Sequence, residues 1–245
     1  MQKDRFKLEQ KYYLRAQDVD IKGEWMPSAI FVRMQEIAED HATSVGAGRV
    51  DLVDKKGLGW VLTRMAVDMN SYPKIGQTIR VATWPLKPTR LIFLRQFQFS
   101  DMDGNILGMA SSQWVLFDIG ARTLKRTTVL GDYPYDPALP AVMEEPGKII
   151  LPAAMEKRKT RTVLYSDVDM NVHMNNTKYL NWICELFPSA MLEKQRLERI
   201  RINYIAEAYI DQQVDLYMQE EGGGWFVCGK TGDKTVFDAF VTWKG

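Results

Sequence analysis

Apolar side chains recur along this chain in two series, each with helical spacing first and strand-like alternation afterwards. Spacings of three and four residues predict one helix that ends near Gly46 and a second that ends before Pro188. After each helix, residues 61–69 and 199–204 alternate in a way that predicts strands. The positions with helical spacing are Ile30, Phe31, Met34, Ile37 and Ala38 in the first series, and Tyr179, Trp182, Ile183 and Leu186 in the second.

The two series look like copies of one another. The stretch Asp-Val-Asp at 18–20 returns at 167–169, an offset of 149 residues (167 − 18), and Ile79 matches Val214 at an offset of 135 (214 − 79). The order is kept and the offset shrinks, as expected for a duplication whose second copy has shorter loops. A curved sheet around a central helix, the hot-dog arrangement, buries the apolar face of both elements. We therefore predict an α+β fold of tandem (double) hot-dog type, each half a curved antiparallel sheet wrapped around a long helix.

Turn residues and prolines suggest where each copy ends. Asp103-Gly104 and Gly232-Asp233 predict a hairpin in each half, since glycine and aspartate tolerate the backbone of tight turns. Five of the ten prolines fall within residues 131–152, and proline lacks an amide donor, so this stretch is predicted to be an extended connector. The predicted domains are an N-terminal half at 1–130, a proline-rich linker at 131–157 and a C-terminal half at 158–245.

Composition narrows the class of protein. Hydrophobic residues make up 46% of the chain, charged residues 26%, and the formal net charge is +1, which argues against a disordered tail and against a nucleic-acid partner. No apolar run approaches the ~20 residues of a membrane span, and the charged N-terminus lacks the apolar core of a secretory signal. The two cysteines, 44 residues apart (228 − 184), exclude a disulfide framework and a cysteine-based zinc site. We expect a cytoplasmic globular protein with no membrane partner, no metal and no cofactor.

The most polar loop of the chain leads into the second predicted helix. Asp169, Asn171 and His173 are spaced by two, so in an extended segment they would point to one side, next to backbone amides that favour negative charge. Asn175, Asn176 and Thr177 supply N-cap chemistry for the helix. An Asx-rich turn with a helix cap is the structural alternative. The first copy carries Asp20, Lys22 and Glu24 at the three polar positions, and this divergence favours an active half beside a degenerate one.

A second candidate for chemistry is Glu207, near the end of an otherwise apolar predicted strand. Its counterpart in the first copy is Tyr72 (207 − 135). A solvent-facing surface carboxylate is the alternative. If Glu207 faces the helix instead, it is a candidate general base.

Two long motifs resemble those of the acyl-acyl carrier protein (acyl-ACP) thioesterases, the plant plastid enzymes and their bacterial relatives. YSDVDMNVHMNNTKYLNW at 165–182 resembles the family signature, and LGWVLTRMAVDMNSYPKIGQTIRVATWP at 58–85 resembles the motif of its N-terminal half. The resemblance covers nearly the whole chain. It implies tandem hot-dog domains and hydrolysis of fatty acyl-ACP in fatty acid biosynthesis, which releases free fatty acid and terminates chain elongation.

The resemblance also implies a catalytic set of Asp169, Asn171, His173 and Glu207. Asn171 would orient the thioester carbonyl, Glu207 would activate water, His173 would act near the departing sulfur, and Asp169 would anchor the loop. Ala208 stands where an older proposal for the family placed a cysteine nucleophile, so a thiol mechanism is impossible at that position. Plant relatives carry a plastid transit peptide, and its absence here predicts a bacterial-type cytoplasmic enzyme.

Substrate and partner sites are predicted with structural alternatives beside them. The acyl pocket is assigned to the first half, where ordinary packing is the alternative; the candidate residues are Trp60, Arg64 and Met65. Acyl carrier protein is acidic and binds transiently, so a basic landing surface is expected, with a solvated linker end as the alternative. The candidate docking residues are Lys157, Arg158, Lys159 and Arg161. A homodimer is left open, although the two halves could satisfy each other's sheet edges within one chain.

Three other functions compete with acyl-ACP hydrolysis. An acyl-CoA thioesterase shares the expected fold, and a hot-dog dehydratase or hydratase would use a carboxylate–histidine pair to move protons around a C–C double bond. A non-catalytic acyl-binding module needs an apolar pocket but none of the polar set, so the set argues against it. Acyl chain length depends on pocket packing that the sequence does not specify.

Overall fold

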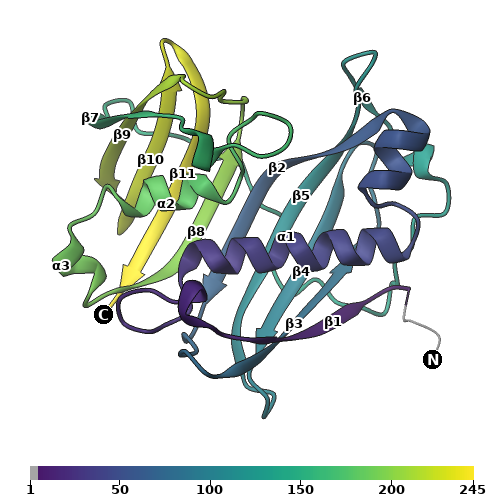
Figure 1. Ribbon diagram of the computed structural model, residues 1–245, viewed down its shortest axis with the longest axis horizontal. Helices are drawn as coiled ribbons and strands as arrows, with labels where there is room; N and C mark the ends of the chain where they lie inside the picture. Colours follow the sequence, from purple (N-terminus) through teal and green to yellow (C-terminus); the bar gives the residue numbers. More distant parts are fainter. Residues whose placement is uncertain (1–4) are drawn as a thin grey trace. The chain divides into compact units, whose positions relative to one another are not determined.

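In each half of the chain, helical segments lie against one face of an antiparallel sheet (Figure 1). The computed structural model describes residues 5–245 and divides into two compact units, the first ending at Pro146 and the second beginning at Gly147. Residues 1–4, part of the charged N-terminal stretch, lie outside the described residues. No helix within 5–245 combines the length and apolar character needed to cross a membrane.

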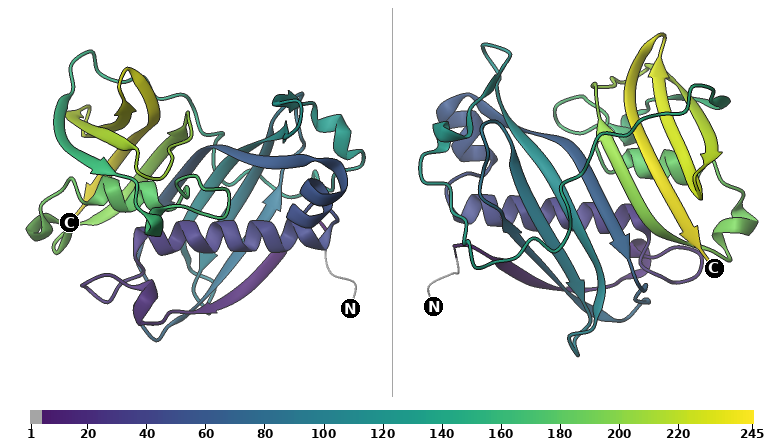
Figure 2. Two further views of the ribbon diagram at one scale, coloured as in Figure 1. Left: turned by 45° about the horizontal axis from the view of Figure 1, so that its top comes forward. Right: turned by 180° about the vertical axis from the view of Figure 1, so that it is seen from behind.

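The first unit has the strand order β1-β3-β4-β5-β2, with β6 paired to β5 and every pairing antiparallel. Helix α1 runs across this sheet, as both views of Figure 2 show. The elements are β1 (Leu8–Tyr13), a 3-10 turn (Ala16–Asp18), α1 (Pro27–Ser44), a π-helical turn (Val50–Asp54), β2 (Leu58–Met69), β3 (Thr78–Pro85), β4 (Phe93–Ser100), β5 (Ile106–Asp118), β6 (Thr123–Lys125) and a 3-10 turn (Thr127–Leu130).

The second unit repeats this topology with the order β7-β9-β10-β11-β8, again antiparallel throughout. Read as β1 to β7, β3 to β9, β4 to β10, β5 to β11 and β2 to β8, the two orders are the same, so the predicted duplication and the tandem hot-dog fold are confirmed. The elements are β7 (Glu156–Thr162), a 3-10 turn (Tyr165–Asp167), α2 (Lys178–Cys184), α3 (Ser189–Leu192), β8 (Arg196–Tyr204), β9 (Gln213–Glu221), β10 (Gly224–Thr231) and β11 (Lys234–Lys244).

Helix α1 forms where the spacing predicted it. Pro27 opens it, and its missing N–H is no loss at a first turn. The predicted apolar positions are all buried. At the other end, Ala47 N–H donates to the Ala42 carbonyl (2.8 Å) and Gly46 N–H to the Thr43 carbonyl (3.1 Å). Gly46 has φ +75°, so it ends the helix in the left-handed conformation that glycine adopts without strain.

The helix of the second unit is shorter than expected. α2 has 7 residues against 18 in α1. After α2, Leu186 N–H donates to the Ile183 carbonyl and Phe187 N–H donates to the Cys184 carbonyl, both i→i−3 hydrogen bonds of 3.1 Å. Pro188 is the next residue. Proline has no amide to donate and disfavours helical geometry in the residue before it, so the helix cannot continue. A separate turn, α3, begins at Ser189.

Strand β2 departs from the simple alternation predicted for 61–69. Leu62 pairs with Trp114 and Arg64 with Gln113, which leaves Thr63 as the extra residue of a β-bulge. The bulge shifts the side-chain phase, so Val61 is 42% exposed whereas Met65 is fully buried. The predicted hairpins at Asp103-Gly104 and Gly232-Asp233 are present, between β4 and β5 and between β10 and β11.

The proline-rich stretch has neither helix nor strand from 131 to 155. Its first part packs against the first unit: Trp84 Nε1–H donates to the Pro140 carbonyl (2.9 Å), and Val142 N–H and Met143 N–H donate to Gln96 Oε1 (3.0 and 2.9 Å). The boundary between the units therefore falls inside this stretch, after Pro146.

Candidate active site

The polar loop ahead of α2 is a tight turn and not the extended segment expected. Asp169 N–H donates to the His173 carbonyl (2.9 Å), and Val172 N–H donates back to the Asp169 carbonyl (2.9 Å). A bridge between Val168 and Met174 closes the turn. Asp169, Asn171 and His173 are therefore not spaced along an extended segment, because the chain reverses direction between them.

The ends of the turn are fixed by two further residues. Asp167 accepts the Leu164 N–H on its side chain (3.0 Å) and the Asn175 N–H on its carbonyl (2.8 Å). Asn175 Oδ1 then accepts both the N–H and the hydroxyl of Thr177, at 2.9 and 2.8 Å, whereas Thr177, the residue at the N-cap of α2, makes no side-chain capping bond. Helix α2 starts at Lys178, five residues after His173 (178 − 173). The first backbone amides of the helix were expected to lie next to His173 and favour negative charge there, and this expectation has no support from the structure.

Glu207 lies beyond the end of β8, in the loop that follows it. This loop is tied to the polar turn by the Met174 N–H bond to the Ala208 carbonyl (2.8 Å) and by a bridge between His173 and Tyr209. His173 Nδ1 and Glu207 Oε1 are consequently 3.2 Å apart, although the residues are separated by 34 positions (207 − 173). The fold thus brings together two of the four predicted catalytic side chains in direct contact.

The pair is partly open to solvent. The His173 side chain is 31% exposed and the Glu207 side chain 53% exposed, so its Coulomb attraction is screened and contributes little to stability. On the inner side lies Tyr179 of α2, which is buried. Burial, and then the negative charge of Glu207, raise the pKa of the Tyr179 phenol. Glu207 therefore has a solvent-accessible side and a side that faces a buried tyrosine.

Tyr209 completes this cluster and was not among the predicted site residues. Its hydroxyl donates to Glu207 Oε2 (2.7 Å), and its ring meets the His173 ring edge-on at 4.9 Å and 85°. The signal available in the sequence was its spacing of two from Glu207, which places both residues on one side of an extended loop.

The other two predicted residues occupy the turn itself. Asp169 Oδ1 accepts the Asn171 N–H (2.8 Å), so Asp169 shapes the turn. The Asn171 side chain is exposed and makes no hydrogen bond to any of the residues described, 5–245. Its amide is thus available to an incoming group.

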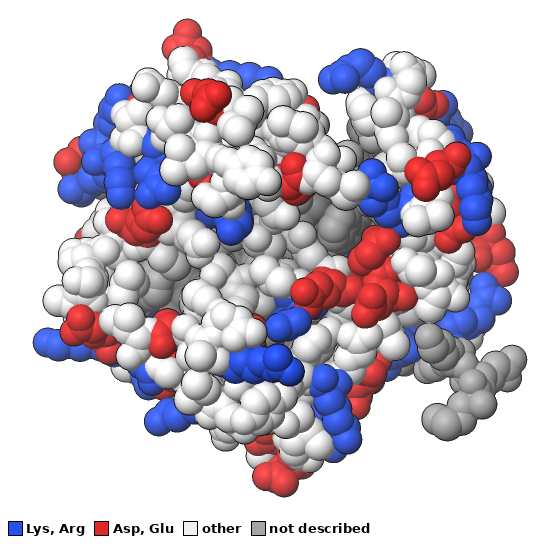
Figure 3. Space-filling model, in the orientation of Figure 1, with Lys and Arg blue, Asp and Glu red and all other residues white. Residues whose placement is uncertain are grey.

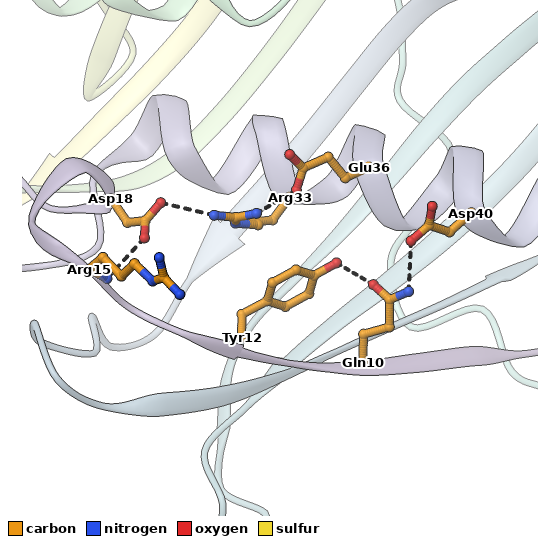
Figure 4. Close-up of polar contacts among 7 residues, drawn as sticks. All are labelled: Gln10, Tyr12, Arg15, Asp18, Arg33, Glu36 and Asp40. Atoms are coloured by element: carbon orange, nitrogen blue, oxygen red, sulfur yellow. Dashed lines mark hydrogen bonds and ion pairs between the residues drawn. The ribbon is translucent and has the colours of Figure 1, made fainter.

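The matching turn in the first unit keeps the frame and changes the side chains. Asp18 accepts the Arg15 N–H (2.9 Å), as Asp167 does for Leu164, and it also pairs with Arg33 of α1 at 3.1 Å (Figure 4). The Arg33 guanidinium lies over the ring of Tyr12, 5.0 Å from its centroid. Burial, reinforced by the charge of Glu36, raises the pKa of Tyr12 to about 12. These groups contact one another, and none of them is a histidine.

At the three divergent positions, the first unit forms an internal ion pair. Lys22 Nζ lies 3.0 Å from Asp20 Oδ2, and Asp20 Oδ1 accepts the Lys22 N–H at 2.9 Å. Glu24, the counterpart of His173, is only 4% exposed. The polar side chains at these positions are therefore paired or buried in the first unit, whereas Asn171 in the second unit is exposed.

The first unit contains a cavity between α1 and strands β2, β4 and β5 that holds about 450 Å³ of unfilled space, its open mouth included. Trp60, Phe93 and Tyr133 form an aromatic wall, with Trp60 edge-on to Phe93 at 4.8 Å. Trp60 is fixed by its Nε1–H bond to the Ala47 carbonyl (2.8 Å). Arg64 and Met65 are not among the residues that line this cavity; Arg64 donates to the Pro146 carbonyl (3.1 Å) and Met65 is fully buried.

A buried polar cluster adjoins that cavity and was not foreseen. The Arg95 guanidinium donates to Thr83 (3.3 Å) and Tyr133 (3.1 Å), and its Nη1 lies 3.0 Å from His41 Nδ1. His41 lies in the last turn of α1 and is fully buried. Its apolar-face position in α1 was the only sequence signal for burial.

The predicted docking residues lie on β7, and each has an acidic neighbour. Lys157 pairs with Asp215 (2.8 Å), Arg158 with Glu156 (2.9 Å), and both Lys159 and Arg161 with Glu185. Four cations beside three carboxylates leave a local charge of +1 (4 − 3), smaller than the sequence run suggests. Lys and Arg are likewise interspersed with Asp and Glu over the face seen in Figure 3.

The two cysteines lie apart from the pair. Cys228 is fully buried, and burial raises the pKa of its thiol to about 11. Cys184 is half-buried. Ala208, next to Glu207, is buried. Within the described part of the chain, no group of three or more His, Cys, Asp or Glu residues has the arrangement of a metal site.

Comparisons with known families match both units. A family model described as the acyl-ACP thioesterase N-terminal domain matches residues 5–132, and one described as the acyl-ACP thioesterase C-terminal domain matches residues 152–238. The chain is 30% identical over 232 residues to the chloroplastic palmitoyl-acyl carrier protein thioesterase of Cuphea hookeriana, which covers 88% of this chain and 56% of that protein. The chain thus spans little more than half the length of this relative.

Two solved structures share the fold over nearly the full chain. An acyl-ACP thioesterase from Bacteroides thetaiotaomicron superposes with a TM-score of 0.89 at 26% identity, covering 97% of this chain and 98% of that one. The 12:0-ACP thioesterase from Umbellularia californica gives a TM-score of 0.82 at 23% identity, covering 97% of both chains, which supports the fold alone.

Proposed function

The chain belongs to the acyl-ACP thioesterase family, and we propose that it hydrolyses the thioester of fatty acyl-ACP, releasing free fatty acid and terminating chain elongation. The observation that carries this proposal is the 3.2 Å contact between His173 Nδ1 and Glu207 Oε1, in a site whose turn also carries the exposed side-chain amide of Asn171. Thioester hydrolysis needs a base for water, a donor for the carbonyl oxygen and a proton for the leaving sulfur, and this cluster offers all three.

Glu207 is the proposed general base. Its carboxylate, 53% exposed, can reach a water molecule and take one proton as the water oxygen attacks the thioester carbon. The Asn171 amide would donate to the carbonyl oxygen, where negative charge develops. Asp169 has a supporting role, because its bond to the Asn171 N–H holds the turn in shape.

His173 is the proposed proton donor to the leaving group. As the C–S bond breaks, an imidazolium gives its Nε2 proton to the sulfur and keeps the Nδ1 proton that faces Glu207 Oε1. Protonated Glu207 then releases its proton to solvent water and Nε2 takes a proton up from solvent, since both side chains are partly exposed. One water is consumed, and one carboxylic acid and one thiol leave. Both residues thereby return to their starting state without any covalent intermediate on the protein.

The first unit is proposed to supply the acyl pocket and to carry no catalytic residues. Its aromatic-walled cavity suits an apolar chain, and its own turn is closed by the Lys22–Asp20 pair. Trp60 is the residue of the predicted set that lines the cavity. Arg64 and Met65 stay predictions for this role. We further propose the β7 cations as the landing surface for acidic carrier protein, with a modest effect given their acidic neighbours.

The test is a hydrolysis assay of the full chain on acyl-ACP and acyl-CoA substrates of several chain lengths, with Glu207→Gln and a matched Glu220→Gln control. Glu220 is an exposed carboxylate of β9 in the same unit. We expect hydrolysis of acyl-ACP whose kcat Glu207→Gln lowers by about 10²–10⁴ and Glu220→Gln preserves. Higher kcat/KM on acyl-CoA would assign the CoA thioester as substrate, and the absence of hydrolysis on either carrier would contradict a thioesterase.

A further inference from the structure

We propose that Tyr209 is a positioning residue that fixes both partners of the His173–Glu207 pair, an inference that rests on the proposed function. Three contacts converge on it: the hydroxyl on Glu207 Oε2 at 2.7 Å, the ring edge-on to His173 at 4.9 Å, and the backbone bridge to His173. It touches each member of the pair by a different part of the same side chain.

The hydroxyl sets the orientation of the carboxylate. Oε2 accepts from Tyr209 while Oε1 lies 3.2 Å from His173, so the two oxygens of Glu207 have different partners. A carboxylate has about four lone-pair sites, so these contacts leave acceptor capacity for water. Without the phenol, a carboxylate that is 53% exposed is free to rotate into solvent and away from His173.

The ring restrains the imidazole. An edge-on aromatic contact has a preferred geometry and restricts rotation of the half-buried His173 ring about its side-chain bonds. Glu207 binds only one of the two ring nitrogens, Nδ1, which leaves Nε2 for the sulfur. Tyr209 thus acts on the direction in which each reacting group points.

The backbone of Tyr209 is itself held from two sides. Its N–H donates to Gln212 Oε1 (3.0 Å), its carbonyl accepts the Gln212 N–H (3.1 Å), and Asp211 between them has φ +64°. Tyr209 is 45% exposed, so burial alone does not fix its side chain. The contacts to the pair are what place it.

The experiment compares Tyr209→Phe, which keeps the ring and removes the hydroxyl, with Tyr209→Leu, which removes both. The control is Tyr217→Phe on β9, whose hydroxyl makes no hydrogen bond within residues 5–245. We expect Tyr209→Phe to lower kcat about tenfold with KM and melting temperature unchanged, and Tyr209→Leu to lower kcat further. The control should match wild type. A kcat of Tyr209→Phe within twofold of wild type would overturn the proposal.

A second measurement separates positioning from an independent effect. If Tyr209 acts through Glu207, adding Tyr209→Phe to Glu207→Gln should cost no further activity, because residues that act as a unit are not additive. A further tenfold loss in the double variant would overturn the proposal while leaving Glu207 as base. Wild-type kcat in Glu207→Gln would instead refute the proposed mechanism itself, whatever Tyr209→Phe does.

Discussion

The turns at 18–26 and 167–175 have the same backbone and different side chains. In the first, Asp20 N–H donates to the Glu24 carbonyl at 2.8 Å; in the second, Asp169 N–H donates to the His173 carbonyl at 2.9 Å. Bonds from Gly23 and from Val172 back to the aspartate carbonyl are 2.9 Å in both. The aspartates that shape the turn are present in both copies, and the residues that differ, Lys22 and Glu24 against Asn171 and His173, come after them.

The side chains of the two turns differ in their partners and in their exposure to solvent. Lys22 and Asp20 neutralise each other in the first unit, and Glu24 is buried. In the second, Asn171 is exposed and unbonded within the described residues, and His173 meets Glu207. A site for chemistry thus arises where the turn leaves polar groups open to a ligand, and the closed copy shows what the frame alone requires.

The largest expected effect tests this division directly. Glu207→Gln or His173→Ala should lower kcat by about 10²–10⁴, the usual range for loss of a positioned acid or base. Glu24→Gln, the counterpart of His173 in the first unit, should lower the melting temperature more than kcat, because that side chain is buried. Steady-state kinetics and thermal unfolding on all three variants provide the check. If Glu24→Gln folds stably and loses as much kcat as His173→Ala, the proposal that only the second turn is catalytic is wrong.

The turns also differ at the residue with positive φ. Gly23 has φ +69°, but its equivalent is Val172 with φ +64°, a conformation that costs a β-branched residue about 1–2 kcal/mol. Gly23→Val should therefore destabilise the protein by about 1–2 kcal/mol, since the nearest atom to an added Cβ is 3.8 Å away and leaves backbone strain as the main cost. Val172→Gly should relieve that strain, partly offset by the flexibility of glycine in the unfolded chain. Chemical denaturation measures both, and equal stability of Gly23→Val and wild type would contradict the strain.

A smaller effect is expected from the β7 cations. With a local charge of +1, raising the salt concentration should lower kcat/KM on acyl-ACP only about two- to fivefold, because surface attraction is screened over about 8 Å at physiological ionic strength. A small acyl thioester should show a flat profile. Replacing Lys157, Arg158 and Lys159 by serine should remove most of the salt dependence. An unchanged salt curve in that variant would place the docking surface elsewhere.

No effect on turnover is expected from the cysteines. Because burial raises the pKa of Cys228 to about 11, its thiol stays protonated near neutral pH and is a poor nucleophile. The double variant Cys184→Ala, Cys228→Ala should keep wild-type kcat, measured beside its melting temperature. Loss of kcat at an unchanged melting temperature would show that a thiol takes part.

Much of the fold could be predicted because its signals are local. Helix α1 and its end at Gly46, the hairpins at Asp103-Gly104 and Gly232-Asp233, and the duplication follow from spacing and turn residues along neighbouring positions. The polar loop with His173, and Glu207, were candidates on residue type and position, and the resemblance to a known family implied their roles. These features depend on short-range chemistry, which the order of residues specifies by itself.

Only the tertiary structure determined which segments that are distant in the sequence contact one another. The bulge at Thr63 and the Arg95–His41 cluster depend on pairing and packing between distant segments. The same holds for the site: the distance between His173 and Glu207, and the contacts of Tyr209 with both residues, depend on the tertiary structure. Those contacts exist because the loop after β8 pairs with the polar turn, 34 positions away, and such a pairing is fixed by the sheet as a whole.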